Sequence, residues 1–160
     1  AIWAADPFIG IEQALQVALD AESAGLAFYD EVLQNTKDPE IKVLAVEPPA
    51  GELVEGLRSL DDGYIPPVFD KWGGYDLLDG KSIVRPRESL EWARALAGIG
   101  AFAGISAGAA MAGAAKTAAK LDEGTIVFIV ADSGWKYLST GAWTLDLDEA
   151  ARNAEKVIYF

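Results

Sequence analysis

The sequence predicts an α/β protein with a partial parallel sheet flanked by helices and preceded by one long amphipathic helix. Segments of strand character alternate with segments of helical character along the chain, which is the order typical of α/β folds. Residues 125–131 (TIVFIVA) are continuously apolar, as expected for a strand buried on both faces of a parallel sheet. With 160 residues, 51% of them hydrophobic, the chain can form one domain with a core but not two full-sized ones.

The first predicted element is an amphipathic helix over residues 10–35. Its apolar residues recur at helical spacing, at Ile11, Leu15, Leu19, Leu26, Tyr29 and Leu33. Residues 37–39 (KDP) end this helix, because proline cannot continue it. Residues 41–46 (IKVLAV) then predict a short buried strand, which two prolines at 48–49 close.

The middle of the chain predicts a loop-rich excursion between two strands. Residues 51–80 are rich in Gly, Pro and Asp and have no sustained period. A short strand is expected at 83–85. Pro86 and Glu88 then open a helix that runs to about Leu96, since proline suits a first helical turn and acidic groups suit a helix N-terminus.

Three further elements are predicted after the glycines at 98 and 100. A helix over 107–121 consists mostly of Ala and Gly, so its backbone can approach a neighbour or a ligand closely. The strand at 125–131 follows, and then a short helix at 147–154 and an apolar segment at 157–160. The order of these elements completes the α/β prediction.

Composition excludes several classes of function. The 25 acidic and 13 basic residues give a formal net charge of −12, which disfavours nucleic acid and anionic membranes as partners. Cysteine and histidine are absent, so there are no disulfides, and chemistry must use other side chains or a cofactor. No apolar run reaches the length of a membrane-spanning helix and no signal peptide is apparent. We therefore expect a soluble, cytoplasmic protein.

Residues 101–110 (AFAGISAGAA) carry the first candidate site. They place Ser106 at the turn into the small-residue helix, where its hydroxyl and free backbone N–H groups could face a ligand. From spacing alone, glycines next to an Ala-rich helix more often indicate close packing of the helix on a sheet.

Two linked motifs carry a resemblance to a known family. Residues 101–110, followed by IVFIVADSGWKYLSTGAW at 126–143, resemble signatures of the cysteine synthases, pyridoxal-phosphate enzymes of fold-type II. Residues 41–70 resemble the preceding part of the same family. Their LRSLDDGY segment and the ending AEKVIYF resemble the branch that uses O-phosphoserine rather than O-acetylserine. The resemblance covers residues 37–160 and implies a division into an N-terminal helix, 1–36, and an α/β domain, 37–160.

The resemblance implies roles for individual residues. Ser106 would hydrogen-bond the pyridine nitrogen of the cofactor, and Gly104 belongs to the same motif. Asp132 and Ser133 would line the cofactor edge, and the alternative for each is a capped turn at the start of the next helix.

Arg58 would hold the phosphate of the amino-acid substrate, since its planar guanidinium suits a two-point grip on an oxyanion. Its alternative is a surface salt bridge with Asp61, Asp62 or Glu55.

The chain departs from the family in one central respect. The lysine that bears the cofactor as a Schiff base in a P-x-x-S-x-K-x-R context, and the loop that cradles the cofactor phosphate, are both absent. None of the eight lysines lies in such a context: Lys37, Lys42, Lys71, Lys81, Lys116, Lys120, Lys136 and Lys156. We therefore predict no catalytic residue here, no covalent pyridoxal phosphate, and no cysteine synthase activity of the chain alone unless a partner supplies the missing half.

The N-terminal helix resembles the first helix of rubrerythrin and other ferritin-like proteins, in which a glutamate at the position of Glu22 binds iron. The E-x-x-H motif of that family is missing. Three hypotheses follow: a cysteine synthase fragment that needs a complementing half; a non-catalytic scaffold or interaction module, natural or chimeric or designed, which could form a homo-oligomer; and a ferritin-like metal binder.

Overall fold

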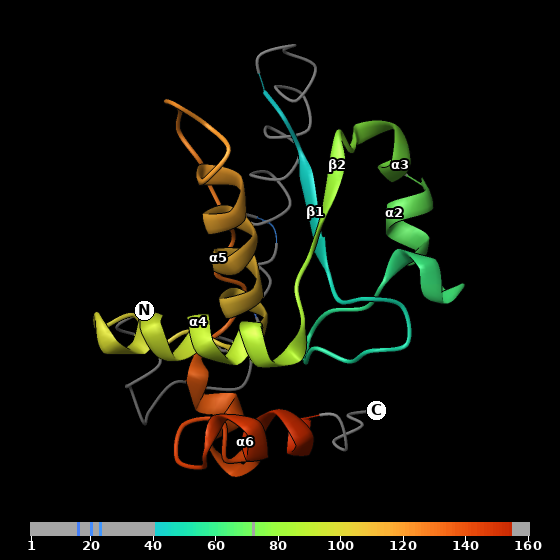
Figure 1. The fold of residues 1–160 in the computed structure, drawn as a ribbon. Helices are drawn as coiled ribbons and strands as arrows, with labels where there is room; N and C mark the ends of the chain where they lie inside the picture. The colour runs from blue at the N-terminus through green and yellow to red at the C-terminus, as the bar shows by residue number, and fades with distance from the viewer. Residues whose placement is uncertain (1–15, 17–19, 21–22, 24–40, 72, 155–160) are drawn as a thin grey trace. The chain divides into compact units, whose positions relative to one another are not determined.

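The computed structural model describes residues 16, 20, 23, 41–71 and 73–154, drawn in colour in Figure 1. The chain forms two compact units, residues 1–43 and 44–160. The predicted helix over 10–35, Glu22 and the last segment, 157–160, lie almost wholly outside the described residues. Of that helix, Gln16, Asp20 and Ser23 are described and are helical. The predicted boundary between residues 36 and 37 stays a prediction.

The second unit contains a parallel pair of strands. β1 (Leu44–Glu47) pairs with β2 (Gly80–Ile83), with Leu44 opposite Gly80. β1 ends before Pro48, as predicted, but begins three residues later than the predicted strand. β2 precedes the predicted 83–85, because the chain leaves the sheet at Val84 to enter the next helix.

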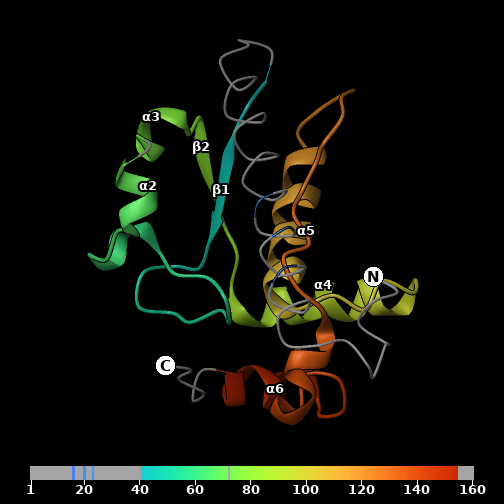
Figure 2. The ribbon, with the colours of Figure 1, turned by 180° about the vertical axis from the view of Figure 1, so that it is seen from behind.

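Within its described residues, the excursion between β1 and β2 contains short helices joined by loops, where the lack of period predicted a loop-rich segment. They are the 3-10 helix η2 (Leu60–Asp62), α2 (Pro67–Lys71) and α3 (Gly74–Leu77). Figures 1 and 2 show α2 and α3 on the β2 side of the strand pair and α5 on the β1 side. Mixed helix and parallel strand confirm the α/β class.

Two crossing helices form the centre of the second unit. α4 (Pro86–Gly98) begins at the predicted proline, and α5 (Ile105–Ala118) is the predicted small-residue helix. A Cβ on Gly108 would lie 2.1 Å from the carbonyl oxygen of Ser89. The backbones therefore meet at Gly108, which confirms the close approach predicted for this helix.

The core lies around this crossing. Ser89 is fully buried and its hydroxyl donates to the carbonyl of Ile105 at 2.6 Å. The main cluster of buried residues consists of Val54, Val84, Leu90, Ile105, Ala109, Ala112, Tyr137, Ala142, Ala150 and Ala151. α6 (Leu147–Ala154), the predicted last helix, lies on the side of α4 opposite α5 (Figure 1).

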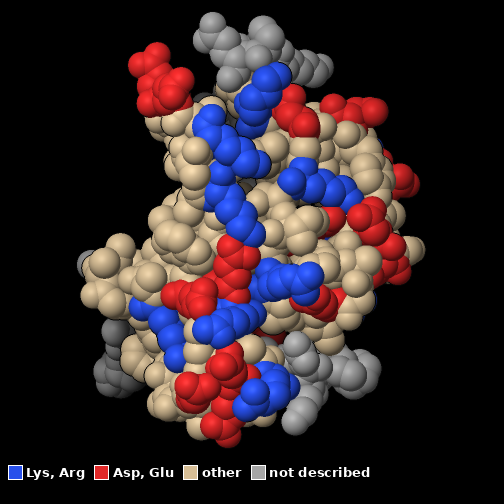
Figure 3. All heavy atoms as spheres, viewed as in Figure 1, with Lys and Arg blue, Asp and Glu red and all other residues tan. Residues whose placement is uncertain are grey.

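The surface in the orientation of Figure 1 interleaves basic and acidic side chains (Figure 3). Lys116 pairs with Glu88 at 2.7 Å, and Arg87 pairs with Glu91 at 3.2 Å and also with Asp148. These acidic partners offset the basic groups of the pairs, while Figure 3 shows further basic side chains gathered above them. None of the described helices is long and apolar enough to cross a membrane.

The predicted strand at 125–131 is wrong. In the structure the segment is unpaired (Figure 2), and Val127, Ile129 and Val130 are 84%, 52% and 53% exposed. An apolar, β-branched sequence favours an extended backbone, but a strand forms only where a neighbour accepts its hydrogen bonds. Within the described residues the sheet consists of β1 and β2 alone, and neither pairs with this segment.

Candidate functional site

A tight turn at residues 54–57 forms one wall of the candidate site. The N–H of Leu57 donates to the carbonyl of Val54 at 2.9 Å, and Gly56 has φ of +84°. A Cβ at Gly56 would lie 3.2 Å from the Cβ of Ser106 and 3.3 Å from its Oγ. Glycine is therefore favoured here twice, by its positive φ and by its approach to Ser106.

Ser106 lies in the first turn of α5, and Gly104 is the N-cap residue of that helix. It is only 9% exposed. The first N–H groups of a helix lack acceptors within the helix, and the N-terminal end carries a partial positive charge. The predicted placement of Ser106 at the turn into a helix is confirmed, and the free N–H groups there can donate to a hydrogen-bond acceptor.

Short backbone pairing brings the two sequence motifs together. The N–H of Gly104 donates to the carbonyl of Asp132 at 3.0 Å, and the N–H of Gly134 donates to that of Phe102 at 3.0 Å. Ala103 and Ser133 form an antiparallel bridge. The structure thus places Asp132 and Ser133 directly beside the start of α5.

Asp132 and Ser133 have different surroundings. Ser133 is the N-cap residue of the 3-10 helix η3 (Gly134–Thr140), and its Oγ accepts from the N–H of Trp135. The capped-turn alternative is therefore confirmed for Ser133. The Oδ2 of Asp132 accepts a hydrogen bond from the hydroxyl of Tyr137 at 2.7 Å and lies 3.4 Å from the Nζ of Lys136.

The side chain of Asp132 can occupy its position only because residue 104 is a glycine. A Cβ at Gly104 would lie 1.9 Å from the Oδ1 of Asp132 and 2.8 Å from the ring of Tyr137. The absence of a side chain lets this carboxylate pack against the N-terminal end of α5. Gly104 thus positions the Asp132 side chain.

Glu55, in the turn beside Gly56, is a member of the site that the sequence did not reveal. It is 8% exposed, and neither of its carboxylate oxygens has a hydrogen-bond partner in the described part of the chain. Burial raises the pKa of Glu55 above its usual value, and the negative charge of Asp132 raises it further. The sequence predicts Glu55 only as a surface partner of Arg58. Its burial depends on contacts between distant segments, and no local pattern signals it.

Arg58 is exposed, and its guanidinium carbon lies 5.8 Å from the centre of the Tyr64 ring. That distance is typical of a cation–π contact. Asp61 pairs with Lys81 at 3.0 Å and Asp62 accepts from the N–H of Gly51 at 2.9 Å. Among the described residues no carboxylate lies within ion-pair distance of Arg58, so the salt-bridge alternative is wrong for these residues.

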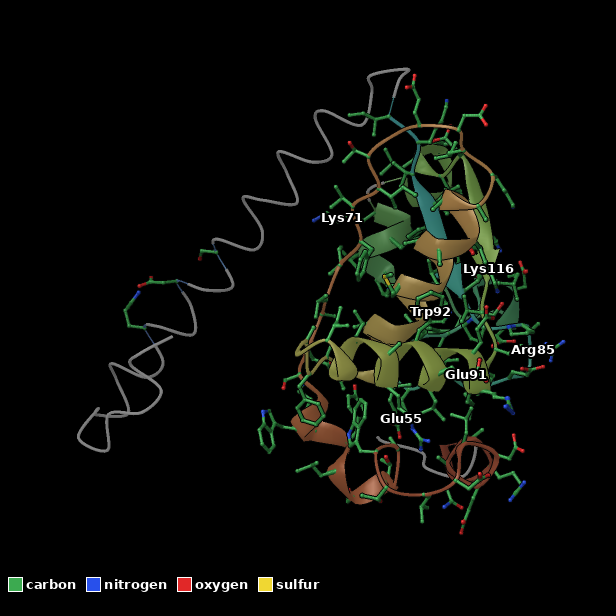
Figure 4. All side chains as sticks on the ribbon, turned by 60° about the vertical axis from the view of Figure 1, so that its left-hand side comes forward. Glu55, Lys71, Arg85, Glu91, Trp92 and Lys116 are labelled. Carbon is green, nitrogen blue, oxygen red and sulfur yellow. The ribbon has the colours of Figure 1, made fainter. Side chains whose placement is uncertain are left out.

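The described lysines include one that reaches this site. Lys136 approaches Asp132 and Lys81 pairs with Glu47. Lys116, labelled in Figure 4, pairs with Glu88. No group of three His, Cys, Asp or Glu side chains suited to a metal ion occurs in the described part of the chain. The site is therefore a polar helix end with two carboxylates beside it.

Comparison with known proteins gives partial matches. No protein-family profile matches the chain. Cysteine synthase B of Escherichia coli is 31% identical over 104 residues, 64% of this chain and 33% of that one. The cysteine synthase of Aquifex aeolicus is 33% identical over 113 residues, 67% of this chain and 33% of that one. That of Staphylococcus aureus (strain Mu50) is 32% identical over 117 residues, 68% of this chain and 36% of that one.

The chain spans about a third of the length of the curated relatives it matches. Within that third, the identity is close to 30% over about two-thirds of the present chain. The C-terminal part of this chain is therefore cysteine synthase-like in sequence.

Proposed function

We propose that residues 37–160 are the C-terminal part of a pyridoxal-phosphate-dependent cysteine synthase of fold-type II, from the branch that uses O-phosphoserine. The observation that carries the proposal is Ser106, mostly buried in the first turn of α5 with the Gly56 turn packed against its hydroxyl. The similarity to cysteine synthases supports it. The reaction would replace the phosphate of O-phosphoserine: the bond between the β-carbon and oxygen breaks and releases phosphate, and a sulfur donor then forms a bond to the β-carbon, which yields L-cysteine.

The residues around Ser106 fit one end of the cofactor. A neutral hydroxyl beside the positive end of a helix favours an unprotonated pyridine nitrogen as its acceptor. Asp132 and Ser133 lie beside the same helix end, where they would border the ring. Pyridoxal phosphate, when bound, withdraws electrons from the α-carbon of the substrate and so permits loss of the β-substituent.

The chain lacks the lysine setting of the family, so we propose that it is inactive without a complementing half that supplies it. The exposed apolar residues Val127, Ile129 and Val130 favour a second candidate function, a non-catalytic interaction module. The ferritin-like alternative depends on Glu22, which lies outside the described residues, and it stays a prediction.

Cofactor binding by the chain alone is expected to be weak and reversible. We predict that absorbance changes on adding pyridoxal phosphate are lost after dialysis, because no lysine lies in the family context. The Ser106→Ala variant should need a higher cofactor concentration for the same change, and Ser139→Ala, at an exposed serine with no proposed role in binding, serves as its control. A band that survives dialysis and disappears on substitution of one lysine would contradict this prediction.

The second test concerns the substrate phosphate site that we propose at Arg58. We predict that O-phosphoserine and inorganic phosphate raise the melting temperature, because a ligand bound only to the folded state stabilises it, by about 2.7 kcal/mol at a hundredfold excess over Kd. Arg58→Ala should abolish the increase. Arg85→Ala should retain it, since Arg85 is also exposed but pairs with Glu52. No increase in the parent protein would refute the proposed phosphate site.

A further inference from the structure

Unpartnered carboxylate oxygens mark a second feature of the site. Four buried side-chain oxygens lack a hydrogen bond in the described part of the chain: Glu47 Oε1, both Glu55 oxygens and Asp132 Oδ1. Glu47 Oε1 lies 3.0 Å from the Nζ of Lys81, so an ion pair accounts for it. The other three oxygens belong to Glu55 and Asp132, and no described cation contacts them.

Glu55 and Asp132 belong to one neighbourhood. Asp132 Oδ1 packs against Gly104, while Gly56, the residue after Glu55, packs against Ser106. Gly104 and Ser106 both lie at the start of α5. The electrostatic effect of Asp132 on Glu55 is consistent with this proximity. Figure 4 shows Glu55 within the body of the second unit, in view between α4 and α6.

Such an arrangement is unfavourable without a partner of opposite charge. A buried carboxylate that accepts no hydrogen bond retains its full desolvation cost, and two carboxylates close together repel. Lys136 approaches only the Oδ2 of Asp132, and its side chain is 68% exposed. The three orphaned oxygens therefore need hydrogen-bond donors from elsewhere.

A primary ammonium group matches these requirements. It carries one positive charge and three N–H donors, the same number as the orphaned oxygens. Mg²⁺ and Ca²⁺ are poorer matches, because they take six or more oxygen ligands, and the described residues contain no group of three or more His, Cys, Asp or Glu that could hold a metal ion. The net charge of −12 also attracts small cations.

We propose that Glu55 and Asp132 form a binding site for an ammonium-type cation, either the free ammonium ion or the protonated amine of a small molecule. Because Asp132 Oδ1 lies against the first turn of α5, an occupant would bridge the 54–57 turn and the 132–134 segment. The site shares Asp132 with the proposed cofactor edge, but its test uses neither pyridoxal phosphate nor Arg58. Its test can therefore fail or succeed separately from that of the proposed function.

The decisive comparison is between ammonium and potassium ions, which are similar in size but differ in N–H donors. We expect ammonium chloride to raise the melting temperature above that in potassium chloride of equal concentration. Methylammonium chloride distinguishes the two kinds of ligand. If it raises the melting temperature as much as ammonium chloride does, the site accepts amines; if it raises it less, the site is one for the free ammonium ion. In Glu55→Gln the ammonium and potassium curves should coincide. In Glu123→Gln, where the glutamate is exposed, the difference should remain.

Equal effects of ammonium and potassium in the parent protein would overturn the proposal, as would an undiminished ammonium effect in Glu55→Gln. Near-ultraviolet circular dichroism establishes that each variant is folded, and Asp132→Asn replaces Glu55→Gln if the latter is not.

A second readout is proton release. A bound cation favours the ionised carboxylate and lowers the raised pKa of Glu55, so binding near that pKa should release protons. Calorimetry in buffers of different ionisation enthalpy measures this release, and its absence in the parent protein would also overturn the proposal.

Discussion

Gly108→Ala should reduce the free energy of unfolding of the second unit by about 3 kcal/mol or more, the upper range for overpacking a tight core. The added Cβ would lie 2.1 Å from the carbonyl oxygen of Ser89 and 2.6 Å from the backbone nitrogen of Ala93. Both are backbone atoms of α4, so no side-chain rotation can relieve the contact. The helices would have to separate, and the core around their crossing would open.

The matched control is Gly98→Ala. Gly98 ends α4, and nothing lies within 4 Å of its added Cβ. Alanine is the better helix former by about 1 kcal/mol in a helix interior, so this variant should be as stable as the parent or slightly more so. Urea unfolding, followed by tryptophan fluorescence and circular dichroism, compares the two variants. Equal stability of Gly108→Ala and Gly98→Ala would mean that α4 and α5 do not meet as described.

Leu90→Ala is expected to have the second large effect, a loss of about 2–5 kcal/mol of unfolding free energy. Leu90 is 1% exposed and lies in the main core cluster with Ile105 and Ala109. Its neighbours are mostly small or belong to rigid helices, so the cavity left by truncation cannot collapse fully. The loss then combines the lost transfer of the side chain from water with the cost of the cavity.

Leu138→Ala provides the comparison, because Leu138 is 52% exposed. A surface substitution of this kind typically changes stability by about 0.5 kcal/mol or less. Urea midpoints of the two variants are measured under the same conditions. A midpoint of Leu90→Ala that equals that of Leu138→Ala would contradict the location of the core between α4, α5 and α6.

Local rules predicted the helices well. Pro86 and Glu88 at the start of α4 are signals that act within a few residues, and the helix begins where they lie. The Ala- and Gly-rich composition of α5 also predicted its close packing. The error at 125–131 has a different origin. A continuous apolar run indicates that a segment favours a buried environment. A β-strand also needs a neighbouring strand that accepts and donates its backbone hydrogen bonds, and the run itself does not specify one.

The same distinction applies to the site. Family resemblance directed attention to Ser106 and Asp132, and the structure brings them to one end of α5. Glu55 was missed, because the turn that buries it packs on Ser106, about fifty residues further along the chain. For Arg58, sequence proximity suggested acidic partners, yet Asp61 and Asp62 point to Lys81 and Gly51 instead. Proximity in sequence gives candidate partners, and packing selects among them.

The exposed apolar segment around Val127 also bears on whether molecules of the protein associate with one another. Residues 124–131 carry no charge, so copies of this segment attract one another through apolar contact, while the net charge of −12 keeps whole molecules apart. Salt shortens the range of the repulsion to about 10 Å at 0.1 M and leaves the apolar attraction intact. We expect rising ionic strength to favour association of the molecules and dilute buffer to favour the dispersed state.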